Sequence, residues 1–185
     1  MTLPDPPILV ITDRRMAERP LADVVEAALR GGCRWVLLRE PDLATDVLID
    51  LGRTLQPLCR RHGAVLSVSA DILAAAALGA GLQLPQRAAQ TGCIASARTT
   101  LGASVPIGIS CHSQEEADAA ARLGADYVTL SPVFLTDSKP GYGPALGAGR
   151  LSSMAAATSL PVLGLGGITP ENAAAVRRSG AAGIA

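Results

Sequence analysis

The sequence predicts a single (β/α)8 barrel, the TIM-barrel fold of the α/β class, as one domain over residues 1–185. Short runs rich in Val, Ile and Leu recur along the chain, and Ala-rich stretches with helical spacing separate them. This alternation is typical of βα units on a parallel sheet. The main alternative is an open doubly wound sheet that holds a nucleotide, and the absence of a G-x-G-x-x-G motif after the first run disfavours it.

Each expected strand is a short apolar run. We expect strands at Ile8–Thr12, Trp35–Arg39, Ala64–Ser69, Gly81–Leu84, Ile107–Ser110, Tyr127–Ser131, Val162–Gly166 and from about Gly183. Because the chain as given stops inside the last of these, we expect the eighth helix of the barrel to be missing or disordered.

Signals at helix ends support this order of elements. The stretch Leu21–Arg30 carries apolar residues at helical spacing and runs into two glycines, which end helices well. Ser113 and Glu116 predict a capping box at the start of a helix. Thr169 followed by Pro170 predicts an N-cap and the first helical position.

Composition narrows the class of partner. Sixteen basic residues balance sixteen acidic ones and aromatics make up 2% of the chain, so we expect no nucleic-acid partner and no attraction to an anionic membrane. The uncharged stretch from Leu151 to Pro170 is interrupted by Pro161 and glycines, which predicts a buried helix and strand rather than a membrane span. Four cysteines without C-x-x-C spacing or a secretory leader favour the reducing cytoplasm. We expect a small-molecule partner, and a homo-oligomer stays open.

Polar side chains fall late in several expected strands, on the face that strand alternation assigns to the barrel interior. They are Arg39, Ser69, His112 and Ser131, and Ser110 shares the face of His112 in its strand. TIM barrels keep their chemistry at this end of the strands. The alternative for each serine is that it only fills the narrow interior.

His112 is the candidate catalytic residue. Its imidazole is the group in this set that can both take and give a proton near neutral pH. The alternative is a histidine that merely enters the helix capped by Ser113. The other histidine, His62, lies at a basic helix end before Gly63 and is expected to be structural.

Two loops predict a site for an anion. Gly166 and Gly167 follow the seventh strand and precede a helix start, which is the recurrent phosphate position of these barrels, although paired glycines are also common in turns. The long loop after the sixth strand carries Thr136, Ser138 and Lys139. Their hydroxyl and ammonium groups suit anion binding or a mobile lid, and a plain solvated loop would contain the same residue types.

A series of motifs runs along the chain in a fixed order. They are Ile11-Thr12-Asp13, Leu38-Arg39-Glu40, Ile107-Gly108-Ile109-Ser110 with His112, Gly124-Ala125-Asp126-Tyr127-Val128, Ser131-Pro132-Val133-Phe134 followed by Thr136 and Ser138-Lys139, and Gly166-Gly167-Ile168. In order and spacing they resemble the thiamine phosphate synthase/TenI superfamily along essentially the whole chain. The resemblance implies a barrel of thiamine biosynthesis that binds a thiazole phosphate, with Thr136, Ser138 and Gly167 as contacts.

The sequence departs from the synthase branch of that superfamily at its metal site. The resemblance implies that synthases couple a pyrimidine pyrophosphate to the thiazole phosphate with Mg²⁺, held by aspartates in an Asn-Asp-Arg and a His-Leu-Gly-Gln-Glu-Asp segment. The places of these two segments are taken here by Val68-Ser69-Ala70 and by Gln83-Leu84-Pro85-Gln86-Arg87-Ala88. The glutamine that precedes Leu-Arg in the synthases is Leu37 here, and the lysine that follows is Pro41. Asp71 lies nearby but is expected to start the third helix. Because Mg²⁺ needs hard oxygen ligands, we expect no metal and no cofactor.

The lost aspartates and the retained histidine favour the TenI branch, which includes thiazole tautomerases and which the Gln83-Leu84-Pro85 segment also resembles. We therefore expect an isomerase that aromatises a carboxythiazole phosphate. His112 would move the proton, Ser110 or Ser131 would fix its tautomer, and Arg39 would pair with the substrate carboxylate. The Gly166-Gly167 loop would hold the phosphate. Two alternatives stay open: a Mg²⁺-dependent thiamine phosphate synthase, and a non-catalytic regulator that binds thiamine phosphates.

Overall fold

The computed structural model describes residues 2–90, 92–136 and 143–185, and the chain divides into two compact units. Unit 1 comprises Met1–Gln83 and Ala97–Val105, and unit 2 comprises Leu84–Ser96 and Pro106–Ala185. The expectation of one barrel domain stays a prediction.

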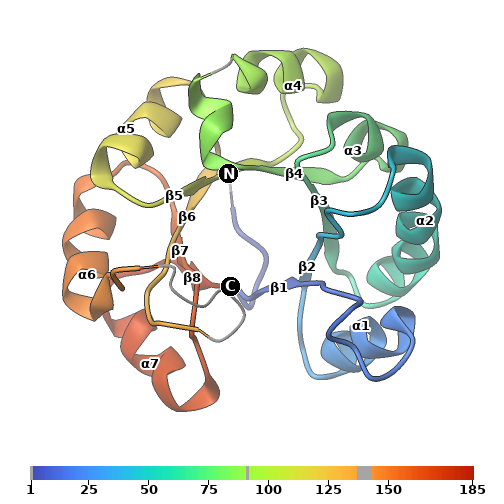
Figure 1. Ribbon diagram of the computed structural model, residues 1–185, viewed down its shortest axis with the longest axis horizontal. Helices are drawn as coiled ribbons and strands as arrows, with labels where there is room; N and C mark the ends of the chain where they lie inside the picture. The colour runs from blue at the N-terminus through green and yellow to red at the C-terminus, as the bar shows by residue number, and fades with distance from the viewer. Residues whose placement is uncertain (1, 91, 137–142) are drawn as a thin grey trace. The chain divides into compact units, whose positions relative to one another are not determined.

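Unit 1 is built of βα steps. Its strands run parallel in chain order, with register pairs Leu9↔Trp35, Trp35↔Val65 and Ser67↔Gly81. Figure 1 shows the helices of this unit on one face of these strands. The elements are β1 (Leu9–Ile11), α1 (Leu21–Arg30), β2 (Trp35–Leu38), α2 (Thr45–Arg61), β3 (Val65–Ser69), α3 (Ile72–Leu78) and β4 (Gly81–Leu84), the last reaching the unit boundary.

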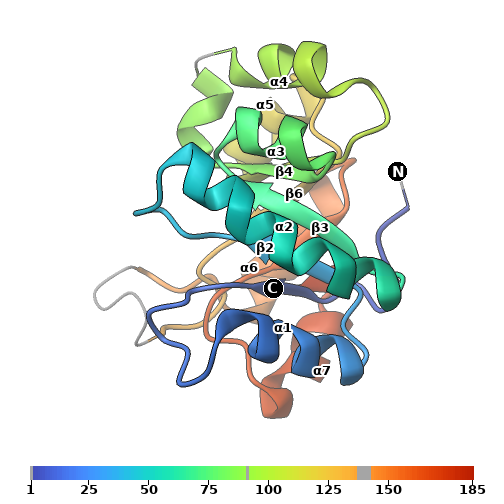
Figure 2. The same ribbon diagram turned by 90° about the vertical axis from the view of Figure 1, so that its right-hand side faces the viewer.

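The core of unit 1 follows the predicted alternation of strand side chains. Trp35 is fully buried, and its indole N–H donates to the Ser67 hydroxyl at 3.0 Å, so both side chains lie on the same face of the strands. On the other face, apolar residues of α1 and α2 are buried. Figure 2 shows α2 and α3 side by side. The two helices can approach closely because Gly52 of α2 has no side chain. A Cβ at this position would lie only 2.4 Å from the Leu78 side chain of α3.

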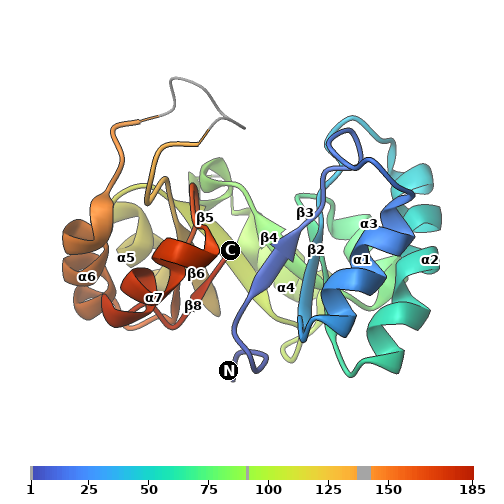
Figure 3. The same ribbon diagram turned by 90° about the horizontal axis from the view of Figure 1, so that it is seen from below.

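Unit 2 repeats the pattern with parallel strands in chain order, and its register pairs include Ser110↔Thr129, Leu130↔Gly164 and Gly164↔Ile184. Figure 3 shows its helices α6 and α7 next to each other. The elements are η1 (Gln86–Gln90), β5 (Ile107–Cys111), α5 (Gln114–Arg122), β6 (Tyr127–Leu130), α6 (Gly147–Ala157), β7 (Val162–Gly164), α7 (Pro170–Arg178) and β8 (Gly183–Ile184). Helix α4 (Cys93–Leu101) has its first residues in unit 2 and the others in unit 1.

The predicted fold class is confirmed: parallel strands alternate with helices in the order of a TIM-barrel-type α/β fold. The largest difference at a strand end is β7, which stops at Gly164, just before the positive φ of Gly166 and Gly167 takes the chain out of strand conformation. The residues after β7 still bond to the segment after β6. Val133 N–H donates to the Leu165 carbonyl at 2.8 Å, and Phe134 N–H donates to the Gly166 carbonyl at 3.0 Å. Among the described residues, no helix has the length and apolar character needed to cross a membrane.

One predicted helix cap differs from expectation. The Ser113 hydroxyl accepts the Glu116 N–H at 3.3 Å, as a capping box requires. The Glu116 carboxylate, however, accepts the backbone N–H of His112 rather than that of Ser113. Glu116 therefore holds the residue before the cap. At α7 the cap occurs as predicted, with Thr169 as N-cap and Pro170 as the first helical residue.

Candidate functional site

A cavity of about 370 Å³ lies in unit 2, beyond the carboxyl ends of β5 and β6. An imidazole, a hydroxyl and a guanidinium group share its wall with proline rings and a leucine. The lining residues are His112, Ser131, Pro132, Gly143, Pro144, Leu146 and Arg150. A cavity of this size and chemistry suits a small molecule with an anionic group.

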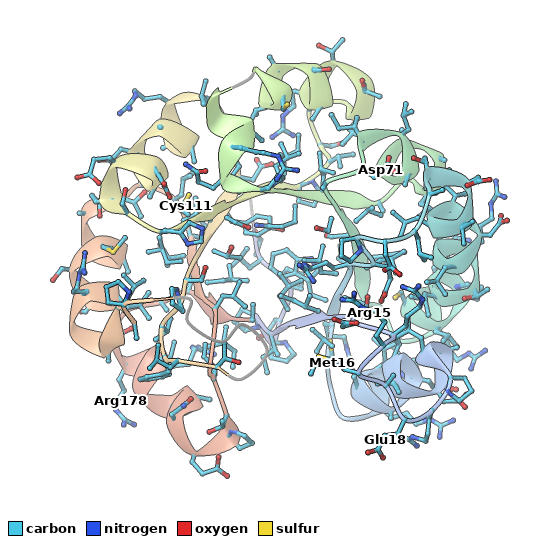
Figure 4. All side chains as sticks on the ribbon, in the orientation of Figure 1. Arg15, Met16, Glu18, Asp71, Cys111 and Arg178 are labelled. Atoms are coloured by element: carbon cyan, nitrogen blue, oxygen red, sulfur yellow. The ribbon has the colours of Figure 1, made fainter. Side chains whose placement is uncertain are left out.

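His112 is held in the one position between β5, which ends at Cys111 (labelled in Figure 4), and the Ser113 cap of α5. Its Nδ1 lies 2.8 Å from the Ser131 carbonyl oxygen and 3.3 Å from the Ser131 hydroxyl. Because a carbonyl oxygen only accepts, Nδ1 carries the hydrogen and Nε2 is the acceptor of the neutral ring. The backbone N–H of His112 donates to Glu116 Oε2 at 2.6 Å, so ring and backbone are both fixed.

Glu116 also connects this site to the segment after β4. Its Oε1 accepts a hydrogen bond from Gln86 Nε2 at 2.9 Å. Both carboxylate oxygens of Glu116 are thus used within unit 2, and the start of α5 is held against η1.

Arg150 lies on the wall of this cavity and is not among the residues that the sequence predicted for the site. It lies in the first turn of α6, exposed at the cavity wall, and makes no hydrogen bond or ion pair with the described residues. A signal was present: Arg150 is the only charged residue between Lys139 and Glu171 in the sequence. Its place on the cavity wall could be assigned only once the start of α6 was known.

Gly166 and Gly167 have a packing role that the sequence did not predict. Gly167 has a φ of +61°, and a Cβ there would lie 2.5 Å from the Leu135 carbonyl oxygen. The Gly167 carbonyl accepts from Asn172 Nδ2 at 2.9 Å. The close approach that these glycines permit is therefore to the backbone after β6, and phosphate binding by this loop stays a prediction.

The structure places the other predicted residues as follows. Ser110 is half-buried on β5, two residues before His112, and Thr136 is half-buried after β6. Ser138 and Lys139 lie outside the described residues.

Arg39 follows β2 in unit 1 and is half-buried. The structure thus brings together His112 and Ser131 from the predicted set, and adds Arg150.

The loop after β1 in unit 1 is rich in ion pairs. Figure 4 labels Arg15 and Met16 there. The Arg15 guanidinium lies 3.0 Å from the Asp13 carboxylate, and this hydrogen bond lowers the pKa of Asp13, with a smaller contribution from the charge of Arg39. Arg15 is thereby paired within the loop.

The described residues do not fit a magnesium clamp. Asp71, labelled in Figure 4, is the N-cap of α3: its Oδ1 accepts the Ala74 N–H at 2.8 Å and its Oδ2 accepts the Thr45 hydroxyl at 2.7 Å. The prediction that Asp71 starts the third helix is confirmed. In the described part of the chain, no three His, Cys, Asp or Glu side chains cluster as metal ligands would. No chemical step is therefore assigned to a metal here.

Known proteins resemble this chain over nearly its full length. The family model for thiamine monophosphate synthase matches residues 8–185. A protein of Roseiflexus castenholzii named thiamine-phosphate synthase is 44% identical over 180 residues, covering 96% of this chain and 78% of the relative. One of the same name from Roseiflexus sp. strain RS-1 is 41% identical over 180 residues, covering 96% and 75%. The solved structure of thiamine phosphate pyrophosphorylase from Pyrococcus furiosus has a TM-score of 0.82 at 32% identity, covering 96% and 83%.

These relatives overturn the expected isomerase. The missing aspartates and the retained His112 favoured a TenI-type tautomerase, but the relatives at 41–44% identity carry the name of the transferase that was the alternative. The tautomerase prediction is wrong, whereas the predicted superfamily is confirmed. A family model that matches residues 8–185, and relatives this similar over 96% of the sequence, establish that the chain belongs to the thiamine monophosphate synthase family.

Proposed function

We propose that this protein is a thiamine-phosphate synthase, a transferase that joins a pyrimidine pyrophosphate to a thiazole phosphate and releases pyrophosphate. The observation that carries the proposal is the 44% identity, over 96% of the chain, to a relative of that name. The family is one of enzymes, which disfavours a purely regulatory protein.

The proposed reaction requires cationic groups at the site. Both substrates are anions, and negative charge grows on the pyrophosphate as it leaves, so cationic groups at the strand ends would stabilise the transition state. We assign the cavity with His112, Ser131 and Arg150 to the thiazole phosphate. In unit 1 we assign Arg39 to the pyrophosphate. Guanidinium groups bind phosphate oxygens through two parallel hydrogen bonds, which suits both assignments.

The test is direct synthesis. The purified chain is incubated with both substrates, with Mg²⁺ or with EDTA, and thiamine phosphate is quantified by mass spectrometry. Formation of thiamine phosphate above the protein-free control is expected. Its absence under both conditions would refute the proposed function.

A matched pair of variants tests the cavity. Arg150→Gln removes the guanidinium from the cavity wall, and loss of a charged hydrogen bond worth roughly 1.5–3 kcal/mol should raise the KM for the thiazole phosphate about tenfold or more. Arg178→Gln is the control, because Arg178 is exposed on the outer side of α7 (Figure 4) and should leave KM within about twofold. Equal KM values for the two variants would remove Arg150 from the site.

A further inference from the structure

A buried carboxylate, Glu40, ties the loops after β1 and β2 together in unit 1. Its side chain has 0% exposure. It accepts the Thr12 hydroxyl at 2.7 Å, and both of its oxygens lie 3.1 Å from the backbone N of Arg14. The Arg14 guanidinium adds an ion pair at 3.0 Å. All of these donors come from the loop after β1.

The charge of Glu40 is balanced locally. A buried carboxylate is costly unless it is paired and hydrogen-bonded, and Arg14 meets both conditions. Arg14 also contacts Asp42 at 2.6 Å, and this hydrogen bond lowers the pKa of the Asp42 carboxyl to about 2. Arg14 is therefore committed to two carboxylates, as Arg15 is to Asp13.

Arg39 differs from both of these arginines. Its guanidinium makes no hydrogen bond or ion pair with the described residues, so it is the cation of this loop cluster that remains available to a ligand. Its backbone, in contrast, is fixed: the Arg39 N–H donates to Thr12 Oγ1 at 3.0 Å, and that hydroxyl donates to Glu40.

These bonds form a closed ring through residues 12, 39 and 40. The ring lies directly after the regular pairing of β1 with β2, which ends at Ile11 and Leu37. The Thr12 N–H adds one more backbone bond, to the Leu37 carbonyl at 3.0 Å, and the Thr12 side chain then begins the ring. It therefore extends the strand pairing by side-chain bonds to the residue that carries the available guanidinium. Fixing the backbone from which the Arg39 side chain projects leaves less conformational freedom to be lost when its guanidinium binds a ligand.

We propose that Glu40 and Thr12 are positioning residues: their ring holds Arg39 in place to bind the pyrophosphate group of the substrate. The inference rests on the function proposed above and adds two residues to it. Neither Glu40 nor Thr12 touches the substrate, and both act through Arg39.

A double-mutant cycle separates this role from a merely structural one. Thr12→Val and Glu40→Gln are each made alone and together with Arg39→Gln, and the KM for the pyrimidine pyrophosphate and kcat are measured. Each single variant should raise KM about tenfold, but should change it less than twofold once Arg39 is already replaced, because the effects of residues that act through one group are not additive. A full tenfold effect in the Arg39→Gln background, or no effect in the native background, would refute the proposal.

Two conservative variants complete the design. Thr12→Ser keeps the hydroxyl and should restore the native KM within twofold. Glu26→Gln removes a carboxylate from a pair with the exposed Arg30 and Arg61 in the same unit, and should also stay within twofold. If Glu40→Gln does not fold, the comparison of Thr12→Val with Thr12→Ser decides, because it leaves the Glu40–Arg14 pair intact.

Binding of inorganic pyrophosphate, measured by calorimetry, keeps the inference separate from the proposed function. If the native protein makes no thiamine phosphate but binds pyrophosphate, the cycle is repeated on the dissociation constant with the same expected tenfold and twofold changes. Failure of the native protein to bind pyrophosphate would overturn the inference itself.

Discussion

Asp71 is a single carboxylate whose two oxygens are both used in unit 1, one for the N–H of α3 and one for the Thr45 hydroxyl. Replacing an N-cap carboxylate by alanine costs about 1–2 kcal/mol of stability. We expect Asp71→Ala to lower the free energy of unfolding by this amount, measured by urea denaturation.

The control for this variant is Asp50→Ala, which removes an exposed carboxylate from a pair with the exposed Arg53 in the same unit. It should change the free energy of unfolding by less than about 0.5 kcal/mol. Unchanged stability of Asp71→Ala together with loss of Mg²⁺-stimulated synthesis would instead make Asp71 a metal ligand.

His112 provides a second prediction at this scale. Since Nδ1 faces the Ser131 carbonyl at 2.8 Å, the neutral ring should carry its hydrogen on Nδ1. The chain has two histidines, so ¹⁵N-labelled histidine gives two sets of ring signals and His62 serves as the internal reference. The signals of Nδ1 and Nε2 differ according to which is protonated. A neutral His112 ring protonated on Nε2 would contradict the geometry.

The site residues differ in how far sequence could predict them. His112 and Ser131 follow their strands directly, and strand alternation alone placed them together. Glu116 was expected to cap its own helix, but its side chain reaches one residue further back, to His112. The other carboxylate oxygen of Glu116 accepts a hydrogen bond from Gln86, and a contact between such distant parts of the sequence leaves no local pattern.

Among the elements, the turn after β7 depends on backbone packing. At Gly167 an alanine would combine a positive φ with a Cβ 2.5 Å from the Leu135 carbonyl oxygen, whereas at Gly180, where φ is +87°, a Cβ would meet nothing within 4 Å. Gly180→Ala should therefore cost about 1–2 kcal/mol of stability for its φ alone. Gly167→Ala should cost at least about 1–3 kcal/mol more, because the segment after β6 must move.

Urea denaturation of both variants measures this difference, and equal costs would mean that the segment after β6 yields freely to the added methyl group. If Gly167→Ala also weakens binding of the thiazole phosphate while Gly180→Ala does not, the turn contributes to the site through the loop that it supports.

Element positions were predictable where short apolar runs define them. The starts of β2, β4 and β5 to β8 occur at the expected residues, because burial on both faces leaves few polar residues in these strands. The end of β7 was not predictable, because the chain leaves strand conformation at the positive φ of Gly166 while Leu165 and Gly166 still pair with Val133 and Phe134. Such pairing leaves no periodic pattern in either segment.

For the molecule as a whole, the cysteines report on folding. Cys33, Cys59 and Cys111 are buried and Cys93 is partly exposed. Burial raises the pKa of Cys59 to about 11 and that of Cys111 to about 12. At pH 8 we expect one thiol to react rapidly with a thiolate-specific reagent in the native protein and all four to react in urea.

The same pKa shifts fix the sign of a pH effect. Above pH about 9 the thiols of Cys59 and Cys111 lose protons in the unfolded chain that they retain in the folded chain, so the free energy of unfolding should fall as pH rises from about 9 toward 11. Urea denaturation at pH 8 and pH 10 measures the fall, and Cys59→Ala should reduce it. Rapid labelling of every thiol at pH 8 in the native state would contradict both expectations.

The function assigned to the whole molecule was the least predictable property. The lost aspartates indicated the loss of the Mg²⁺ site that would neutralise the negative charge of the pyrophosphate. Guanidinium groups can neutralise the same charge, so the missing carboxylates alone do not exclude the proposed transferase. Similarity over 96% of the chain to relatives named thiamine-phosphate synthase covers many more residues than the missing motif, and it outweighs that motif.

Trp35 has a practical consequence. It is the only tryptophan of the chain, and its buried indole is bonded to Ser67 inside unit 1. Its fluorescence emission therefore reports on the core of unit 1, while Tyr127, buried in unit 2, lies in the other unit. Selective excitation of the indole therefore measures the unfolding of unit 1 through a single intrinsic fluorophore, without any added label.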